Sequence, residues 1–290
     1  MFRLIRTAPL VALLVAFSVP VSSPAQEAGA HVVSPADQTL AHEIYRVLHL
    51  DEVVGVMAEE AIAGAAPEDS NQMSAEEQRA WLETLRRVNA PDKMRRLMQE
   101  RLAETVGQAD PALIRRALLF YSTPFGKRVI GLEISARSAM LAPGAEEAAR
   151  EAARQATLAD TPRAAKIQTI ISSGGLVDRN VVSSLNSVIA THRGFTDGAG
   201  EGREDDAATA DAWAQEGEIR ADVADWLTGL LFLAYGPLDD AELAQIASFV
   251  GSPEGRELMD VLDKAYDGMF EQMSYEAGFL AAGQIAGAEL

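Results

Sequence analysis

The chain contains no cysteine among its 290 residues. Structural disulfides, thiolate metal sites, cysteine nucleophiles and lipid attachment through a cleavage-site thiol are therefore excluded. After the first 25 residues, no apolar run approaches the roughly 20 residues that a bilayer-spanning helix needs. No Asn-Gly or Asp-Gly turn separates two alternating strands, and no glycine-rich loop has the spacing of a phosphate-binding motif.

Positive charge is in the minority, with 25 Lys and Arg against 43 Asp and Glu and a net charge of −18. This balance disfavours nucleic acid and anionic lipid as partners. The charge is also uneven: residues 79–137 carry 12 cations and 6 acids, whereas residues 194–290 carry 4 cations and 21 acids. Solvated helix faces are the simpler interpretation. The functional alternative is docking of the basic region against the acidic one, within one chain or head to tail between chains.

Residues 1–25 have the pattern of a secretory signal peptide. Two arginines precede an apolar run over residues 8–19, and small residues follow at Ser23 and Ala25. We expect cleavage near Ala25, which leaves a periplasmic or secreted protein without a transmembrane helix. Residues 26–33 are then a flexible N-terminus.

The periodic segments of the remaining sequence predict an all-α fold, because alanine is abundant and β-branched alternation is scarce. The broadest apolar stripe indicates a central core helix, and consists of Ile219, Val223, Trp226, Leu227, Leu230, Leu231 and Ala234. A narrower stripe consists of Met94, Leu97, Met98, Leu102 and Val106. Helix breaks are predicted from Gly, Pro and Asp at Gly64–Ser70, Asn89–Pro91, Gly107–Pro111, Pro143–Gly144, Asp160–Pro162, Ser172–Gly175, Gly194–Asp206 and Gly236–Asp239.

An internal repeat organises these helices. Asp110–Leu141 aligns without gaps with Asp239–Phe270, 129 positions later. A weaker echo, at an offset of 127, pairs Ile44, Asp51, Ile62 and Ala63 with Ile171, Asp178, Ile189 and Ala190. We therefore predict a tandem duplication of a multi-helix unit, packed as helical bundles. Unit one covers residues 34–142 and unit two covers 161–290, and the connecting segment 143–160 contains a helix over 145–159.

The repeated motif predicts a corner between two helices. Its residues are Phe120, Tyr121, Thr123, Pro124, Gly126 and Lys127 in one copy and Phe249, Ser252, Pro253, Gly255 and Arg256 in the other. The hydroxyl residue suits the cap of the following helix, and proline suits its first position. Glycine one turn inside a helix costs up to ~1 kcal/mol relative to alanine, so close approach of a neighbouring helix is expected there.

This motif resembles that of the domain of unknown function 2059. That family is helical, is typical of secreted bacterial envelope proteins, and has a corner with the pattern Phe-Tyr-x-Ser-Pro-x-Gly-Lys. The resemblance extends over much of both halves, in two copies. The second copy departs from the pattern, because Val250 stands where the family has tyrosine. The family is itself uncharacterised, so the resemblance implies no catalytic residue.

Candidate chemistry is sparse, and we expect neither a cofactor nor a metal. His42 and His49 lie seven residues apart on an expected helix, without the third ligand of a zinc site. The segment 197–206 matches a calcium loop at three positions but has Ala199 and Ala208 where two ligands belong, so a solvated linker is favoured and cation binding stays open. Ser252 with Glu254, and Tyr121 with Lys127, lack a nearby histidine base, and capping accounts for Ser252.

Missing catalytic constellations favour a non-catalytic binding or assembly protein of the cell envelope. One alternative is an envelope-directed hydrolase or transferase that uses carboxylates in an interhelical cleft, such as Glu43, Asp51 or Asp178. Another is a carrier that holds an apolar ligand between helices lined by Met94, Met98, Trp226, Leu230 and Phe232.

Overall fold

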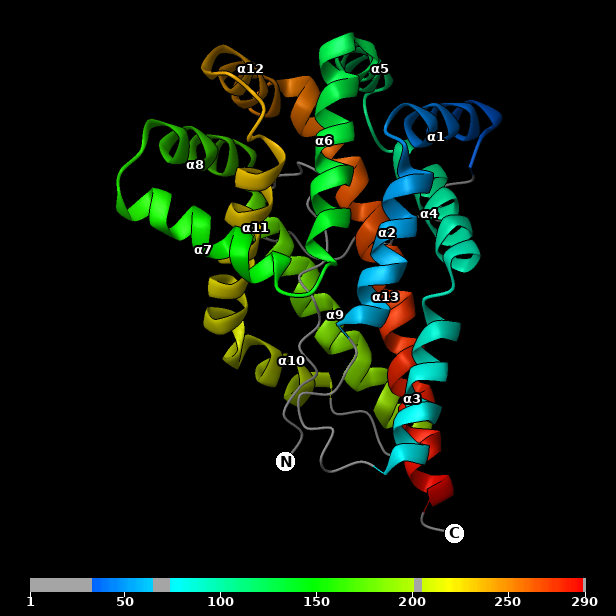
Figure 1. Cartoon of the computed structure of the whole chain (residues 1–290). Helices are drawn as coiled ribbons and strands as arrows, with labels where there is room; N and C mark the ends of the chain where they lie inside the picture. The colour runs from blue at the N-terminus through cyan, green and yellow to red at the C-terminus, as the bar shows by residue number, and fades with distance from the viewer. Residues whose placement is uncertain (1–32, 65–73, 201–204, 289–290) are drawn as a thin grey trace.

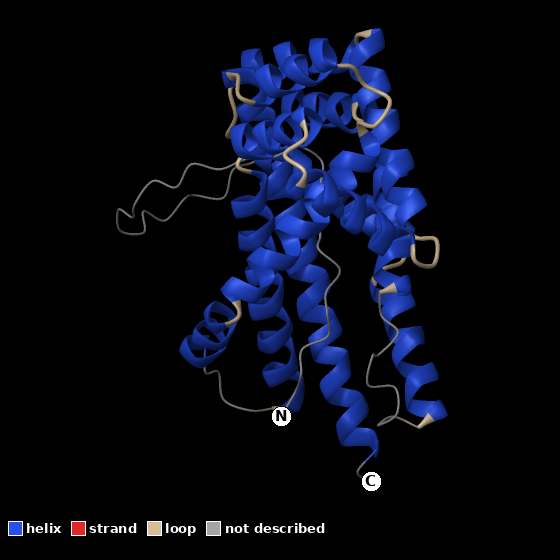
Figure 2. Ribbon diagram, turned by 60° about the vertical axis from the view of Figure 1, so that its left-hand side comes forward, coloured by secondary structure: helices blue, strands red, loops and turns tan. Residues whose placement is uncertain are grey.

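The computed structural model describes residues 33–64, 74–200 and 205–288, and every regular element in these ranges is a helix (Figures 1 and 2). The prediction of an all-α fold is confirmed. The expected signal peptide lies outside the described residues, as does the expected flexible N-terminus except for Val33. The helices are α1 (Pro35–Val47), α2 (Leu50–Ala63), α3 (Ala75–Val88), α4 (Pro91–Val106), α5 (Pro111–Ser122), α6 (Pro124–Met140), α7 (Ala145–Leu158), α8 (Pro162–Gly174), α9 (Leu176–Ala199), α10 (Asp205–Ala214), α11 (Glu216–Ala234), α12 (Asp240–Val250) and α13 (Pro253–Ala288).

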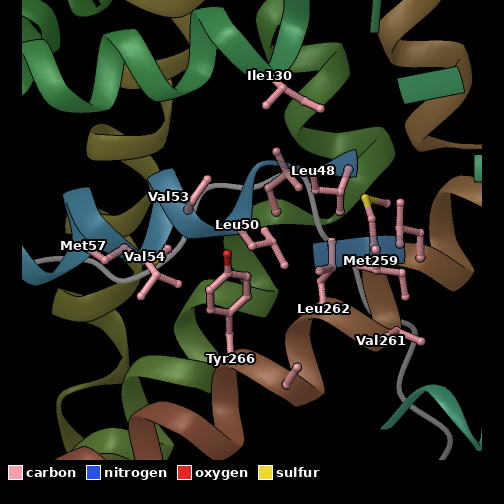
Figure 3. Close-up of a cluster of buried hydrophobic side chains, with 14 of the residues drawn as sticks. Leu48, Leu50, Val53, Val54, Met57, Ile130, Met259, Val261, Leu262 and Tyr266 are labelled. Atoms are coloured by element: carbon pink, nitrogen blue, oxygen red, sulfur yellow. The ribbon is translucent and has the colours of Figure 1, made fainter. Parts of the chain in front are cut away.

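The longest helix, α13, runs through the molecule from the end that carries α5 and α12 toward the C-terminus (Figure 1). It packs against α9 over much of its length and also against α3, α4 and α5. Its residues Leu262 and Tyr266 lie close to Leu50 and Val54 of α2 in the core (Figure 3). One hydrophobic core therefore draws side chains from both halves of the chain. Among the described helices, none has both the length and the apolarity to cross a membrane.

The two apolar stripes of the sequence face this core. On α11, all members of the broad stripe except the half-buried Ile219 are buried, which places α11 in the core as predicted. All five members of the narrower stripe are buried on α4. The burial of these residues stabilises the fold by about 25 cal/mol per Å² of apolar surface removed from water.

Helices α1 to α6 can be matched in order with α8 to α13, and α7 lies between the two sets. α1 packs against α2, α4 and α5, and α8 packs against α9, α11 and α12. Ser34 caps α1 and Thr161 caps α8, and each hydroxyl accepts a hydrogen bond of 3.2 Å from the backbone N–H three residues later. α1 and α8 therefore begin in the same way and have matching neighbours.

An ion pair recurs at the weaker sequence echo. Asp51 at the start of α2 lies 2.9 Å from the Nε of Arg95 on α4. Asp178 at the start of α9 lies 2.5 Å from the Nη1 of Arg220 on α11. Both carboxylates are largely exposed, so each pair contributes about 1 kcal/mol at most. The pairs show that α2 approaches α4 as α9 approaches α11.

The residue immediately before α2 and the residue immediately before α9 both have left-handed backbone conformations. These residues are His49, with φ 53° and ψ 38°, and Gly175, with φ 60° and ψ 26°. A left-handed conformation costs about 1–2 kcal/mol for a residue with a side chain and little for glycine. The imidazole of His49 contacts Glu52, with 3.0 Å between Nδ1 and Oε1.

Two sequence predictions are wrong in this part of the fold. His42 and His49 do not share a helix, because α1 ends at Val47 and the chain turns before α2. The break predicted at Gly194–Asp206 begins too early, because α9 continues to Ala199.

The glycines that suggested that break let α9 approach α13. A side chain on Gly194 or Gly198 would overlap the backbone of α13, and one on Gly278 would overlap the backbone of α9. Residues 197–199 are helical, and the carboxylate of Asp197 accepts a hydrogen bond of 2.8 Å from the Tyr275 hydroxyl. The predicted linker is therefore helical where it begins, while residues 201–204 lie outside the described part.

We expect His49→Gly to raise the free energy of unfolding by about 0.5–1 kcal/mol, because glycine removes the steric cost of the left-handed turn. Gly175→Ala should lower it by about 1 kcal/mol for the same reason. Urea denaturation of each variant measures both effects. The control is His42→Gly, an exposed position inside α1, which should lower stability by a few tenths of a kcal/mol. A stability loss in His49→Gly would contradict the argument.

Candidate functional site

The two helix corners predicted from the repeat contact each other directly. The rings of Phe120, near the end of α5, and Phe249, near the end of α12, stack with centroids 3.9 Å apart and planes 7° from parallel. Tyr121 meets Phe249 edge-on, with 5.3 Å between centroids. Phe120 and Phe249 hold the same position in their copies of the motif. The contact therefore joins the corners at equivalent points, near the end of the molecule where α5 and α12 lie (Figure 1).

The hydrogen bonds of the two corners correspond one to one. The hydroxyl of Thr123 accepts from the N–H of Gly126 at 3.0 Å, and that of Ser252 accepts from the N–H of Gly255 at 3.1 Å. Each hydroxyl also donates to the carbonyl of the motif phenylalanine, at 2.6 Å in both corners. Pro124 and Pro253 are the first residues of α6 and α13. The hydroxyl residues thus cap the helices, which is the role that the sequence predicts for them.

The corner glycines lie against the backbone of the preceding helix. A Cβ on Gly126 would come closer than 3.0 Å to the carbonyl oxygen of Phe120, and a Cβ on Gly255 would do the same at Phe249. Any side chain would force the two helices of the corner apart. The close neighbour that the sequence analysis requires is therefore the preceding helix of the same corner.

The remaining motif residues divide between interior and surface. Tyr121 is buried, whereas Lys127 and Arg256 are exposed in equivalent positions. Burial raises the pKa of the Tyr121 hydroxyl well above its ordinary value, and the nearby Glu133 adds to that rise. Val250 replaces the tyrosine in the second corner. A polar role for Tyr121 is therefore confined to the first copy.

The outward faces of α5 and α12 differ although their inner faces match. The exposed residues at three equivalent positions are Arg115, Arg116 and Leu119 on α5, and Ala244, Gln245 and Ser248 on α12. Leu119 is 67% exposed. α5 thus presents two cations and a large apolar side chain where α12 presents small or uncharged groups.

Beneath the corners, α6 carries a buried carboxyl group. Glu133 is 4% exposed and accepts a hydrogen bond of 2.5 Å from the hydroxyl of Tyr235, which follows α11. Burial raises the pKa of Glu133 from 4.5 to about 7, and the bond from Tyr235 partly opposes this rise. Glu133 therefore changes its protonation near neutral pH inside the core.

One turn further along α6, Arg137 pairs with Glu60 of α2. The guanidinium donates to both carboxylate oxygens, with distances of 2.5 to 2.8 Å. The guanidinium carbon of Arg137 also lies 5.4 Å from the ring centre of Trp226 on α11. Because the pair is largely buried, removing one partner would leave an uncompensated charge in the core.

A second buried charge cluster joins α9 to α13. Arg179 bonds to Asp263, and its Nη2 also lies 2.9 Å from Asp260. Burial raises the pKa of Asp263, and the Arg179 guanidinium partly offsets that rise. Burial also raises the pKa of Asp267, and the Ser183 hydroxyl partly opposes this rise.

The space among these groups is a cavity of about 10 Å³, lined by Arg179, Asn180, Ser183, Asp263, Tyr266 and Asp267. This volume is sufficient for about one water molecule. Among the described residues, the Tyr266 hydroxyl finds no hydrogen-bond partner. The cluster can therefore hold a proton or a water, and its volume leaves no room for a substrate.

The residues considered for other functions do not gather at this cluster. Asp51 and Asp178 pair with different arginines at the surface, and Glu43 lies on α1. Among the described residues, no three His, Asp or Glu side chains lie close enough to hold a metal ion. The residues proposed to line a carrier cavity belong to the packed core or lie against it: Met94, Met98, Trp226, Leu230 and Phe232.

Two of the ion pairs of the described residues join the basic and acidic regions of the sequence. Lys93 of α4 contacts Glu276 of α13, and Arg128 of α6 lies 2.6 Å from Glu242 of α12. Seven further cations of the basic region are exposed: Arg79, Arg86, Arg87, Arg96, Arg115, Arg116 and Lys127. Intramolecular docking therefore uses only part of the positive charge.

Sequence reasoning missed the buried charges. One signal was present in the repeat, because Glu133 and Arg137 align with Leu262 and Tyr266 of the second copy. When a charged residue of one repeat aligns with an apolar or aromatic residue of the other, the charged residue is expected on the face of its helix that packs in the core.

We expect Gly126→Ala to lower the free energy of unfolding by about 2–3 kcal/mol, since its Cβ would overlap the Phe120 carbonyl. The matched control is Gly131→Ala on the same helix. Its Cβ would meet nothing within 4 Å, so stability should rise by about 0.5–1 kcal/mol. Chemical denaturation measures both. Equal effects of the two substitutions would refute the close-approach explanation.

Glu133→Gln tests the buried carboxyl group. Because the folded pKa lies above the unfolded value, its stabilising contribution is complete below about pH 4.5 and is lost as pH rises through about 7. The rise in pKa from 4.5 to about 7 corresponds to about 3 kcal/mol. The variant should therefore be more stable than the parent by up to that amount at pH 8 and similar to it at pH 4.

Denaturation series from pH 4 to pH 8 measure the difference between the two proteins. The control is Glu104→Gln, which removes a partly exposed carboxylate paired with Arg101. The free energy of unfolding of that variant should differ from that of the parent by nearly the same amount at every pH of the series. A constant difference in the free energy of unfolding between Glu133→Gln and the parent would contradict the raised pKa of Glu133.

Comparison with protein families gives one match. A family described as an uncharacterised protein conserved in bacteria, the domain of unknown function 2059, matches residues 92–155. The match runs from α4 into α7 and contains the first corner, so the resemblance expected in two copies is found in one. Comparisons with curated proteins and with solved structures found no match.

Proposed function

We propose that this chain is a non-catalytic binding or assembly factor of the bacterial cell envelope, built by tandem duplication of one helical unit. The observation that carries the proposal is the contrast between the interior and the surface of the two corners. Caps, glycines and the stacked phenylalanines correspond, whereas the exposed residues of α5 and α12 do not. Two copies of one scaffold that present different outward faces are suited to contact different partners.

Three further correspondences support the duplication. Helices α1–α6 can be matched in order with α8–α13, and α1 and α8 have matching neighbours. The pairs Asp51–Arg95 and Asp178–Arg220 join corresponding helices. The left-handed residues His49 and Gly175 precede corresponding helices. Independent origin would have to produce each of these features separately.

The location in the envelope is supported by the first 25 residues, and the bacterial source by the family match. The arginines, apolar run and small residues of that segment are typical of a secretory signal. The matched family is conserved in bacteria. A periplasmic or secreted protein, processed near Ala25, is consistent with both observations.

The buried charges also support a structural role over a catalytic one. Glu133, Arg137 and Arg179 are each bound by a side chain of another helix. The described cavity beside Arg179 is about the size of one water. Such groups stabilise or position helices, whereas catalysis requires contact between the reacting groups and a substrate.

Crosslinking in the bacterial host tests the binding function. The chain is expressed with its own export segment and a C-terminal tag, the cells are crosslinked, and captured proteins are identified by mass spectrometry. We expect reproducible enrichment of an envelope protein, or of an untagged copy of the chain, over a tagged unrelated exported protein. Absence of any enriched protein would contradict the proposed function, as would turnover of an envelope polymer by the purified chain.

A further inference from the structure

Two exposed patches of opposite charge lie far apart on the molecule. The first, the α5 patch, consists of Arg115, Arg116 and Leu119, with Lys127 nearby in sequence at the start of α6. Residues 111–132 contain four cations and no acid. One of these cations, Arg128, is already paired with Glu242. The other three are exposed, so the patch combines free positive charge with a large exposed apolar side chain.

The second, the α10 patch, consists of Trp213 and the exposed acids Asp211 and Glu218 beside the turn between α10 and α11. Trp213 is 59% exposed. Residues 205–218 contain five acids and no Lys or Arg. This patch therefore also combines an exposed apolar side chain with charge of one sign, and the sign is negative.

The two patches complement each other chemically. Arg115 and Arg116 are suited to carboxylates and to the face of an indole ring, and both kinds of group are present in the α10 patch. Leu119 and Trp213 are among the most exposed large apolar side chains of the described residues. Their contact would remove from water two of the large apolar side chains that the fold leaves exposed.

The patches cannot meet within one molecule. α5 lies at the end of the structure that carries α12, whereas α10 lies toward the opposite end (Figure 1). The occupant of the α5 patch is therefore the α10 patch of a second copy. Resting on the proposed binding function, we infer that copies of this chain associate head to tail through these two patches.

Such a contact is heterologous, because the two surfaces that meet are different. Each copy keeps one unused patch, so the association continues into short open chains unless rotation closes a ring. The patches are small and contain charges that remain accessible to solvent. The association should therefore be weak and strongly dependent on salt.

The structure supplies its own control surface, since α12 has the scaffold of α5 without the patch. The variant Arg115→Ala, Arg116→Gln, Leu119→Ser gives α5 the outward residues of α12. The substituted side chains are exposed, so the fold should be retained, which thermal unfolding checks. Trp213→Ala disables the other patch. Leu158→Ser removes a 79% exposed leucine of α7 outside both patches and serves as the matched control.

Sedimentation velocity of the exported, purified chain over a concentration series is the test. We expect the parent and Leu158→Ser to associate. The triple variant and Trp213→Ala should each associate at least about tenfold more weakly, as should the parent when salt rises from about 0.05 M to about 0.5 M. Mixing the two defective variants should restore association but stop it at a one-to-one pair, because each retains the patch that the other lacks.

A parent that sediments as a single monomeric species over the series would overturn the inference, as would a triple variant that associates like the parent. Growth of the mixture beyond pairs would also overturn the head-to-tail arrangement. These failures differ from failure of the proposed function. A monomeric chain that still captures an envelope protein in crosslinked cells keeps the binding role and loses only self-association.

Discussion

Backbone contact at the two glycine corners is the constraint on which the rest of the structure depends. Because Gly126 and Gly255 have no side chains, α6 and α13 leave their corners close against α5 and α12. The hydroxyl caps hold both turns in the same geometry, and the stack of Phe120 on Phe249 joins the turns. Once these two directions are set, α13 is directed through the core and α9 can lie along it. The position of the α5 outward face follows from the same corner.

The buried charges lie where the two halves differ. Glu133 and Arg137 align with Leu262 and Tyr266, so a charge in one half corresponds to an apolar or aromatic residue in the other. Halves related by the proposed duplication could pair in the wrong combination, as happens in domain swapping. A wrong pairing would leave Glu133 or Arg137 buried without Tyr235 or Glu60, at a cost of several kcal/mol. Under the proposed duplication, the buried pairs would therefore favour the right arrangement of the halves over the wrong one.

What the sequence predicts well is local. The caps at Thr123 and Ser252 need only the residues of their own turn, and the α4 stripe needs only helical periodicity. One prediction failed where a distant segment overrides the local preference. Gly194 is a helix breaker by its neighbours in sequence, but it lies inside α9 because α13 occupies the space of its missing side chain. The partners of Glu133 and Arg179 lie on helices far away in the chain, so periodicity alone could not identify them.

The net charge of −18 bears on whether copies of such a chain can approach each other. At long range, like net charges repel. At physiological ionic strength, however, interactions between exposed charges are screened beyond about 8 Å. The charges that act at a contact are then those of the contact itself, and residues 111–132 and 205–218 have opposite signs. Lowering the salt strengthens the local attraction and extends the global repulsion together. The global repulsion therefore makes the gain in association at low salt smaller than the local attraction alone would give.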